Sequence, residues 1–320
     1  MEDKRKTKRI KTEIKLSSIA IIIFAVIILL LCILYAVNKN VFDRMFCATG
    51  LKKKYQVTSE FSVHFIDVGQ GDCSLIKCGD KNILIDTGDS VYSRNVIKYL
   101  KSQNVSKIDY MIISHPHTDH IGGLEEIAKD IKIDTIYMLN IDKNKIPKDV
   151  DYYNINKIIS QNKFNIKNPV SEEKLKVYDA ELTFYVPSYN SENLNNSSIV
   201  TKITYKDKKF LFTGDIEKVS EKELLTKKYD LKADVLKVAH HGSNSSSTDE
   251  FLKAVNPEFC VISCGNDNSF THPSDSTIKR LSVYSKNIFR TDLLSDIVFE
   301  SDNSGLTYKF GKEWYFADNW

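Results

Sequence analysis

Three histidines and an aspartate fall within six consecutive residues, His115-Pro-His117-Thr-Asp119-His120. They follow the apolar run 110–114, which predicts a buried strand, so the cluster is expected on the loop that leaves it. Imidazole nitrogens and carboxylate oxygens bind zinc and similar ions, and a catalytic ion takes about three protein ligands. Four ligands this close together therefore favour two neighbouring ions. An incidental polar loop is the alternative, but the chain has only seven histidines in 320 residues.

Five further motifs follow apolar runs that predict strands. They are Phe65-Ile-Asp-Val-Gly-Gln-Gly-Asp72, Ile83-Leu-Ile-Asp-Thr-Gly88, Phe212-Thr-Gly-Asp215, Lys237-Val-Ala-His-His-Gly-Ser243, and Gly265-Asn266 leading to His272-Pro273. With the histidine cluster and Gly122-Gly123 after it, this set resembles the metallo-β-lactamase superfamily. Its order is similar to the nuclease domain of the ComEC/Rec2 DNA-uptake branch, over roughly residues 60–311. The resemblance implies an α/β fold, the αββα sandwich, in which two mixed sheets lie between helices with the metals at one edge.

The resemblance also implies two divalent ions, zinc or manganese. His115 and His117 would bind the first ion, and Asp119 and His120 the second. Asp215 matches a carboxylate that bridges both ions, holds them close together and screens their repulsion. Taken alone, Asp215 would fit better as the N-cap of the helix that follows it.

A last histidine completes the second ligand set, and His240 and His241 compete for this position. The family often has a histidine followed by glycine here, which favours His241. His240 then becomes a proton donor or a residue that supports a ligand. We assign catalytic roles to Asp119, His240 and His272. His272 would protonate the leaving oxygen, contact a phosphate or fill a ligand position, unless it only caps the helix that follows it.

One departure from the family concerns the first ion. Most hydrolases of the superfamily have another histidine before the bridging aspartate, but none occurs between His120 and His240. Residues 195–198 stand in that region, so we expect a first site with few protein ligands, completed by Asn196 or water. Oxygen ligands suit harder ions, which favours manganese over zinc there.

Other residues are expected to support the ligands. Asp67 and Asp86 stand at the ends of predicted strands, and each is expected to orient a ligand histidine through its second ring nitrogen. Ser243 is expected beside the ligands or the substrate. The segment Gly69-Gln70-Gly71 lacks the Lys-Ser/Thr pair of a P-loop, so it is expected to turn the chain near the site.

The chain is predicted to contain a basic cytoplasmic segment (1–15), a transmembrane anchor (16–37), a stalk (38–60) and one hydrolase domain (61–320). The uncharged anchor, at about 1.5 Å per residue, would span the roughly 30 Å bilayer core. Residues 1–15 carry a net charge of +4, which by the positive-inside rule places them in the cytoplasm and the domain outside the cell. A cleaved secretory signal also starts with basic residues, but its apolar region is shorter, about 7–15 residues.

From residue 61 onward, short strands alternate with helices, which argues for α/β layering. Residues 140–175 are weakly patterned and are interpreted as a surface insertion. The strands are predicted at 62–67, 74–78, 81–86, 107–113, 133–139, 199–205, 209–212, 233–239 and 258–263, and the helices around 96–100, 122–128 and 216–226.

These features predict a membrane-anchored, extracellular phosphodiesterase that resembles the ComEC nuclease domain and uses metal-activated water to attack phosphorus. Its substrate would be DNA or another phosphodiester such as a cell-wall polymer, and no protein partner is predicted. The chain after residue 15 has a net charge of −1, so it lacks the basic excess of a dedicated duplex-DNA binder.

Three alternatives are weaker. A teichoic-acid phosphocholine esterase would carry choline-binding repeats, and the sequence shows none. A non-catalytic binding module would have lost ligands from the cluster, which is intact. A lactonase or thioesterase would usually keep the histidine that is missing here.

Overall fold

The computed structural model describes residues 23–32, 57, 59–140, 159, 164–188, 193–266, 268–302 and 305–312, in two compact units. In the first, formed by Met1–Tyr55 and Lys312–Trp320, residues 23–32 form a helix with mostly exposed side chains. The remainder of the predicted anchor 16–37, the basic segment 1–15 and most of the predicted stalk lie outside the described residues. No helix within the described residues combines the length and the apolar character needed to cross a bilayer.

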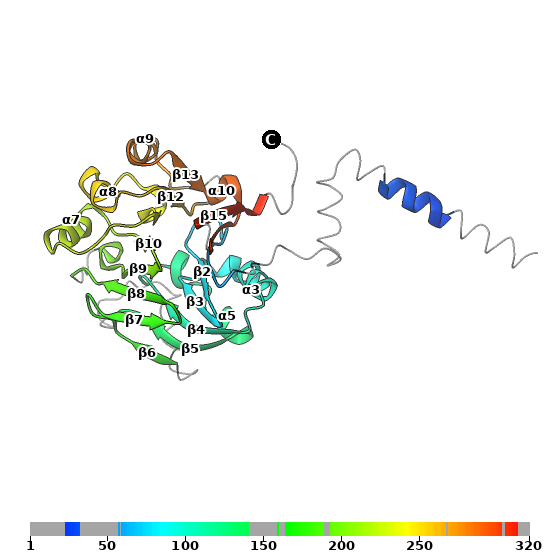
Figure 1. Ribbon diagram of the computed structural model, residues 1–320, viewed down its shortest axis with the longest axis horizontal. Helices are drawn as coiled ribbons and strands as arrows, with labels where there is room; N and C mark the ends of the chain where they lie inside the picture. Colours follow the sequence, from blue (N-terminus) through cyan, green and yellow to red (C-terminus); the bar gives the residue numbers. More distant parts are fainter. Residues whose placement is uncertain are drawn as a thin grey trace, which may run out of the picture. The chain divides into compact units, whose positions relative to one another are not determined.

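The second unit, Gln56–Gly311, contains two β-sheets between layers of helices (Figure 1). The first sheet has eight strands, in the order β15 (Gly305–Phe310), β14 (Ile297–Asp302), β1 (Phe61–Phe65), β2 (Ser74–Cys78), β3 (Lys81–Ile85), β4 (Lys107–Ile112), β5 (Lys132–Tyr137) and β6 (Asn165–Lys167). The strands β3 to β6 pair in parallel, and the remaining pairs are antiparallel.

The second sheet has seven strands, in the order β13 (Asn287–Arg290), β12 (Phe259–Ile262), β11 (Val235–Lys237), β10 (Lys208–Phe212), β9 (Val200–Tyr205), β8 (Ala180–Tyr185) and β7 (Lys174–Val177). Here β10 to β13 pair in parallel, whereas β7 to β10 form an antiparallel meander. Each sheet therefore has one parallel part and one antiparallel part.

Helices cover the outer face of each sheet (Figure 1). The helices α3 and α8 bury apolar side chains against the sheets, Val96 and Leu100 on α3 and Phe251 and Leu252 on α8. The helices are α3 (Ser93–Ser102), α4 (Thr118–Ile121), α5 (Leu124–Asp130), α7 (Lys218–Thr226), α8 (Asp249–Val255), α9 (Asp275–Tyr284) and α10 (Thr291–Leu294), with short 3-10 turns η1 (Ser90–Tyr92), η3 (Leu194–Ser197) and η4 (Ala239–Gly242).

Aromatic side chains join the inner faces of the two sheets. Phe61 of β1 stacks on Tyr205 of β9 with ring centroids 4.2 Å apart, and Tyr137 of β5 stacks on Phe184 of β8 at 4.9 Å. These rings belong to one continuous buried cluster. Burial of apolar area at about 25 cal/mol per Å² is the main force that holds the sheets together. Four cysteines are also buried, all as free thiols: Cys73, Cys78, Cys260 and Cys264.

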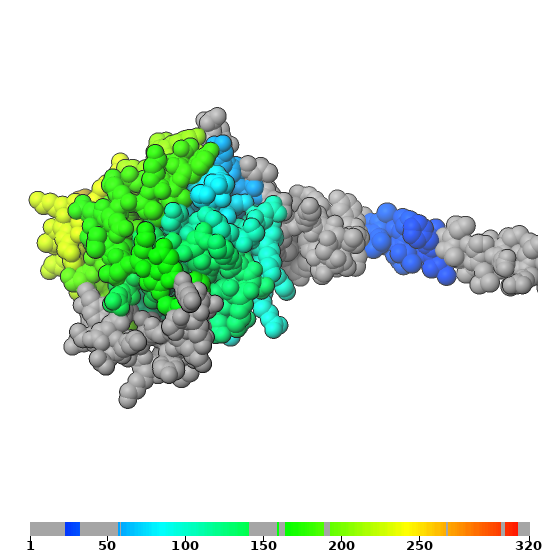
Figure 2. All heavy atoms as spheres, turned by 90° about the horizontal axis from the view of Figure 1, so that it is seen from below, coloured from blue at the N-terminus to red at the C-terminus, as the bar shows by residue number. Residues whose placement is uncertain are grey.

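The predicted αββα sandwich is confirmed, together with the hairpins that turn at Gly79-Asp80 and at 206–208. The interpretation of 140–175 as a surface insertion was wrong in part, because β6 pairs with β5 and extends the first sheet. Figure 2 shows this face, where green atoms of the chain after residue 164 lie beside the teal atoms of β5. The strands β13 to β15 were not expected, since their apolar alternation is weak.

The parallel strands place several loops at one edge of the sandwich. The chain leaves β3, β4, β10, β11 and β12 at their carboxyl ends, and each following loop carries one of the sequence motifs. The crevice beyond the carboxyl ends of parallel strands is the usual place for a site in such sheets. The fold thus brings together motifs that are far apart in the sequence.

Candidate metal centre

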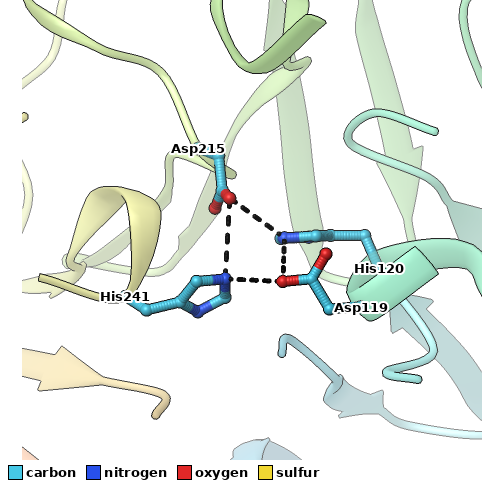
Figure 3. Close-up of side chains that lie close together, drawn as sticks. All are labelled: Asp119, His120, Asp215 and His241. Carbon is cyan, nitrogen blue, oxygen red and sulfur yellow. Dashed lines mark hydrogen bonds and ion pairs between the residues drawn. The ribbon is translucent and has the colours of Figure 1, made fainter. Parts of the chain in front are cut away.

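Four side chains from three loops converge at this edge (Figure 3). Asp119 and His120 belong to α4 after β4, Asp215 follows β10, and His241 follows β11. His241 Nε2 lies 3.1 Å from Asp119 Oδ2 and 3.5 Å from Asp215 Oδ2. His120 Nε2 lies 3.3 Å from Asp215 Oδ2 and 3.8 Å from Asp119 Oδ2. Two imidazole nitrogens and two carboxylate oxygens thus surround one point, and we name these four residues the enclosed group.

The second ring nitrogen of each histidine in the enclosed group has its own buried acceptor. His120 Nδ1 lies 2.9 Å from Asp86 Oδ2, and Asp86 also accepts from the backbone N–H and the hydroxyl of Ser114. His241 Nδ1 lies 2.9 Å from the carbonyl oxygen of Ser263. An Nδ1–H that donates to such an acceptor leaves the Nε2 lone pair free for a metal ion.

The backbone at the β11 end adopts an unusual conformation. His240 and His241 both have φ of 52°, and Gly242 has φ of 81°. Three consecutive residues in the left-handed region are costly for side chains other than glycine, and such outliers concentrate at functional sites. This turn sends the two adjacent imidazoles to different parts of the site.

The enclosed group carries an excess of negative charge. Burial alone would lower the pKa of His120, but Asp215 and Asp119 outweigh burial and hold this pKa well above its usual value. Burial would raise the pKa of Asp215, yet the neighbouring His120 and His241 hold it well below its usual value. Without another cation, the imidazoles would take up protons to balance the carboxylates.

A divalent cation fits this group on two observations. His120 Nε2 and Asp215 Oδ1 are buried and have no hydrogen-bond partner, which is costly unless an ion completes them. The donor set, two neutral imidazoles and two carboxylates, is also one that zinc and manganese accept. The residues present therefore fit an ion at this position.

A second histidine group lies beside the first and is more open. His115 Nε2 lies 3.0 Å from His117 Nδ1 and 3.9 Å from Asp215 Oδ2. Burial lowers the pKa of both His115 and His117, so these rings are neutral and keep lone pairs for a cation. His240 Nε2 also lies 3.9 Å from Asp215 Oδ2, and its side chain is 21% exposed. We name His115, His117 and His240 the open group.

Asn195, rather than Asn196, faces the open group. Asn196 Oδ1 accepts from the backbone N–H of Glu217 and from the Ser220 hydroxyl, so it fixes the start of α7. Asn195 Nδ2 lies 3.4 Å from His240 Nε2, and Asn195 Oδ1 is buried without a hydrogen-bond partner. The expectation that Asn196 completes the first site is therefore corrected, because η3 turns its neighbour toward the histidines.

Three other predicted residues lie around the site. Asp67 Oδ1 accepts from the backbone N–H of Gly69, so it supports the Gly69–Gly71 turn, whereas Asp86 orients a histidine. Ser243 donates its N–H to the His240 carbonyl and pairs its hydroxyl with Ser245, which stabilises the strained turn. The ring centroids of His272 and His240 lie 5.4 Å apart. Burial, with the neighbouring His240 and His241, lowers the pKa of His272 to about 4.

Sequence reasoning missed a buried ion pair beneath the enclosed group. Asp72 Oδ2 lies 2.7 Å from Lys237 Nζ, and Asp72 Oδ1 lies 3.3 Å from His241 Nδ1. Burial opposes ionisation of Asp72, but the Lys237 charge outweighs it and lowers the Asp72 pKa to about 2. The glycine before Asp72 lets this loop pass close to α4, because a Cβ at Gly71 would lie 2.5 Å from the Asp119 carbonyl oxygen. A lysine in the apolar strand β11 was the signal available in the sequence.

Glu217 was also missed. Its Oε1 lies 3.4 Å from His240 Nδ1 and accepts from the Ser245 hydroxyl at 3.0 Å, while Asn193 donates to its Oε2. Glu217 thus lies beside Nδ1 of His240, as Asp86 lies beside Nδ1 of His120. Its position just after Asp215 gave no separate signal.

The chain matches known proteins across most of this unit. Residues 66–265 match the model of the Metallo-beta-lactamase superfamily. The chain is 29% identical to ComE operon protein 3 of Bacillus subtilis (strain 168) over 272 residues, which cover 77% of this chain and 34% of that protein. It is 28% identical to Competence protein ComA of Neisseria gonorrhoeae over 264 residues, 79% of this chain and 35% of the other. The chain spans about a third of the length of these curated relatives.

A solved structure shares the fold. CmlA, a diiron beta-hydroxylase from Streptomyces venezuelae, is similar with a TM-score of 0.50 and 13% identity, over 73% of this chain and 53% of that chain. This similarity concerns the arrangement of sheets and helices alone.

Proposed function

The chain belongs to the metallo-beta-lactamase superfamily, and we propose that it is a metal-dependent hydrolase that cleaves phosphodiesters. One observation carries this proposal. Asp215 Oδ2 lies within 3.3–3.9 Å of imidazole nitrogens from both histidine groups: His115, His120, His240 and His241. A single carboxylate oxygen between two groups of imidazoles suits a pair of cations that share it. Such a pair can stabilise both the attacking and the leaving oxygen in an in-line displacement at phosphorus.

In this proposal, the enclosed group holds one ion and His115, His117 and Asp215 hold the other. When bound, the ions polarise the phosphoryl group and lower the pKa of a water molecule. Asp86 and the Ser263 carbonyl hold the tautomers of His120 and His241. Asp119 and Asp215 balance the positive charge. His240, partly exposed and held by Glu217, is placed to give a proton to the leaving oxygen.

We place the active unit outside the cell, attached by residues 16–37. The basic residues before this uncharged run support that orientation. Protease added to intact cells should remove residues after 56, and protection of those residues would contradict the orientation. The similarity to Competence protein ComA of Neisseria gonorrhoeae supports DNA as the substrate over a cell-wall polymer.

A substrate panel tests this proposal. The full-length protein is assayed with single-stranded DNA, bis-p-nitrophenyl phosphate and a phosphocholine ester, each with zinc or manganese. We expect DNA and the p-nitrophenyl ester to be cleaved, and a chelator to abolish both activities reversibly. Asp119→Asn should remove activity, while Asp130→Asn, an exposed aspartate paired with Lys101, should not. Activity that survives chelation would contradict metal dependence, and cleavage of the phosphocholine ester alone would replace DNA with a cell-wall substrate.

A further inference from the structure

A cavity of about 530 Å³ lies beside the metal centre and takes no part in the chemistry described above. Its volume is within the range of about 300–1,000 Å³ found for small-molecule sites. Two loops and the start of α3 form it: the Gly69-Gln70 turn after β1 and the loop after β12. The lining residues that matter here are Gln70, Tyr92, Asn95, Asn266, Asn268 and Phe270.

Both loops continue directly into the metal centre. The Gly69-Gln70 turn leads to Gly71 and Asp72, and the Asp72 N–H donates to the Asp119 carbonyl at 3.0 Å. On the other side, the Phe270 ring stacks on His272 with centroids 5.8 Å apart and planes 23° apart. The cavity wall therefore ends at a metal-binding loop on one side and at the His272 ring on the other.

Two aromatic rings line this cavity: Tyr92 is packed against the turn, and Phe270 is exposed to solvent. A Cβ at Gly69, where φ is 63°, would lie 2.3 Å from Tyr92 Oη, so this glycine lets the tyrosine ring rest on the turn. Phe270 is 62% exposed although it is a large apolar residue. The Phe270 ring therefore offers a free face on which a flat group could stack.

The polar side chains around these rings are mostly amides. Gln70 Oε1 accepts from the Gly265 N–H, and Asn268 joins Gly265 to His272 through its side chain, so the rim is braced. Amides offer both donors and acceptors. No lysine or arginine is among the described residues that line the cavity, and Asp292 is neutralised by Arg290 at 2.6 and 3.0 Å. The lining therefore suits an uncharged flat ligand better than a phosphate.

We propose that this cavity binds one nucleobase of the nucleic acid whose phosphodiester lies at the metal centre. The base would stack on Phe270 or Tyr92, and the asparagines would contact its edge. Stacking of this kind tolerates any base, because each has an aromatic face. The inference rests on the proposed phosphodiesterase function and adds a base-binding subsite to it.

Binding without catalysis is the first test. Calorimetry on metal-free full-length protein measures the affinity for four uncharged deoxynucleosides, with choline as a competitor of different chemistry. We expect millimolar or tighter nucleoside binding that weakens about tenfold in Tyr92→Ala and in Phe270→Ala. Phe270→Trp should retain binding, and Tyr178→Ala, an exposed tyrosine outside the cavity lining, should match the wild type. No nucleoside binding, or binding of choline alone, would overturn the inference, since Asp67 and the aromatic rings could instead hold a cation.

Catalysis on paired substrates is the second test. Thymidine 5′-p-nitrophenyl phosphate carries a base, whereas bis-p-nitrophenyl phosphate does not. The ratio of their kcat/KM values should fall about tenfold in Tyr92→Ala and Asn95→Ala, mainly through KM of the nucleotide. An unchanged ratio would overturn the base subsite. Failure to cleave either ester, with nucleoside binding intact, would overturn the proposed function and leave the cavity as a nucleoside site.

Discussion

The enclosed and open groups of the metal centre share Asp215 but are built differently. In the enclosed group, both histidines are buried, and each has its second nitrogen bonded to a buried acceptor, Asp86 or the Ser263 carbonyl. In the open group, His115 and His117 contact each other, and His240 is partly exposed. The first arrangement fixes both rings on a carboxylate or a carbonyl oxygen, whereas in the second His115 Nδ1 contacts the Ser114 hydroxyl and His117 Nδ1 contacts the His115 ring. Preorganisation therefore differs between two positions a few ångströms apart.

The enclosed and open groups also differ in the number of carboxylates around them. The enclosed group contains two carboxylates, Asp119 and the shared Asp215, with Asp86 and Asp72 behind them. The open group has one shared carboxylate, and burial keeps the rings of His115 and His117 neutral. We expect the enclosed group to bind its ion more tightly. Three predictions test this difference, and a fourth compares His120 with a buried histidine that has no carboxylate partner.

The largest effect is expected from the shared carboxylate. Asp215→Asn removes the charge that both groups use, so both ions should be lost and kcat/KM should fall by about 10⁴ or more, as expected when the metal chemistry is removed. Metal content by mass spectrometry and hydrolysis of bis-p-nitrophenyl phosphate measure this. Asp119→Asn should remove mainly the enclosed ion. If Asp215→Asn kept one tightly bound ion, the carboxylate would not be shared.

The second prediction concerns the two affinities. On dialysis against a weak chelator, ions should leave in two steps separated by about 100-fold in chelator concentration, since missing supports cost about 10–100-fold in affinity each. Activity should follow the first step and return with manganese. A single step that releases two ions would mean that the open group is as well organised as the enclosed one.

The sequence predicted which loops form this centre, but not the buried contacts between those loops. The cluster from His115 to His120 was expected because ligand types at close spacing follow a predicted strand, whereas Asp215 and His241 were expected from the family resemblance. The structure brings all of them to one edge. Their metal-binding roles stay predictions. A lysine in an apolar strand was a signal for Lys237, but the contacts of Asp72, Lys237 and Glu217 could not be predicted, because they join distant loops and depend on the packing of both sheets. The choice of Asn195 over Asn196 depended on the phase of one 3-10 turn.

The third prediction compares two supporting carboxylates. Asp86→Asn should weaken the enclosed ion by about 10–100-fold, because an amide no longer fixes the His120 tautomer. Glu217→Gln should leave metal affinity near the wild type and lower kcat, because it acts on His240 at the open side. Metal titrations and pH–rate profiles separate the two outcomes. Equal loss of metal in both variants would place His240 among the ligands.

The last prediction asks whether burial or carboxylates distinguish these histidines. His64 is as buried as His120, but its partners are the hydroxyls of Ser62 and Tyr99. Burial, with a smaller contribution from Lys77, lowers its pKa from 6.5 to about 3, opposite to the direction for His120. Since the folded pKa lies below the unfolded value, the unfolded chain takes up the proton first. Stability is then complete above pH 6.5 and is lost as the pH falls toward 3.

This loss from His64 should amount to about 2 kcal/mol at pH 5 relative to neutral pH. His64→Gln keeps a neutral polar side chain, so its free energy of unfolding should depend less on pH by that amount. Urea unfolding of metal-free protein at pH 7.5 and pH 5 measures the difference, because other groups titrate alike in both proteins. Parallel pH profiles would show that His64 is protonated inside the fold. A buried histidine without carboxylate partners would then bind a proton as His120 does, and the carboxylates would not be needed to explain the raised pKa of His120.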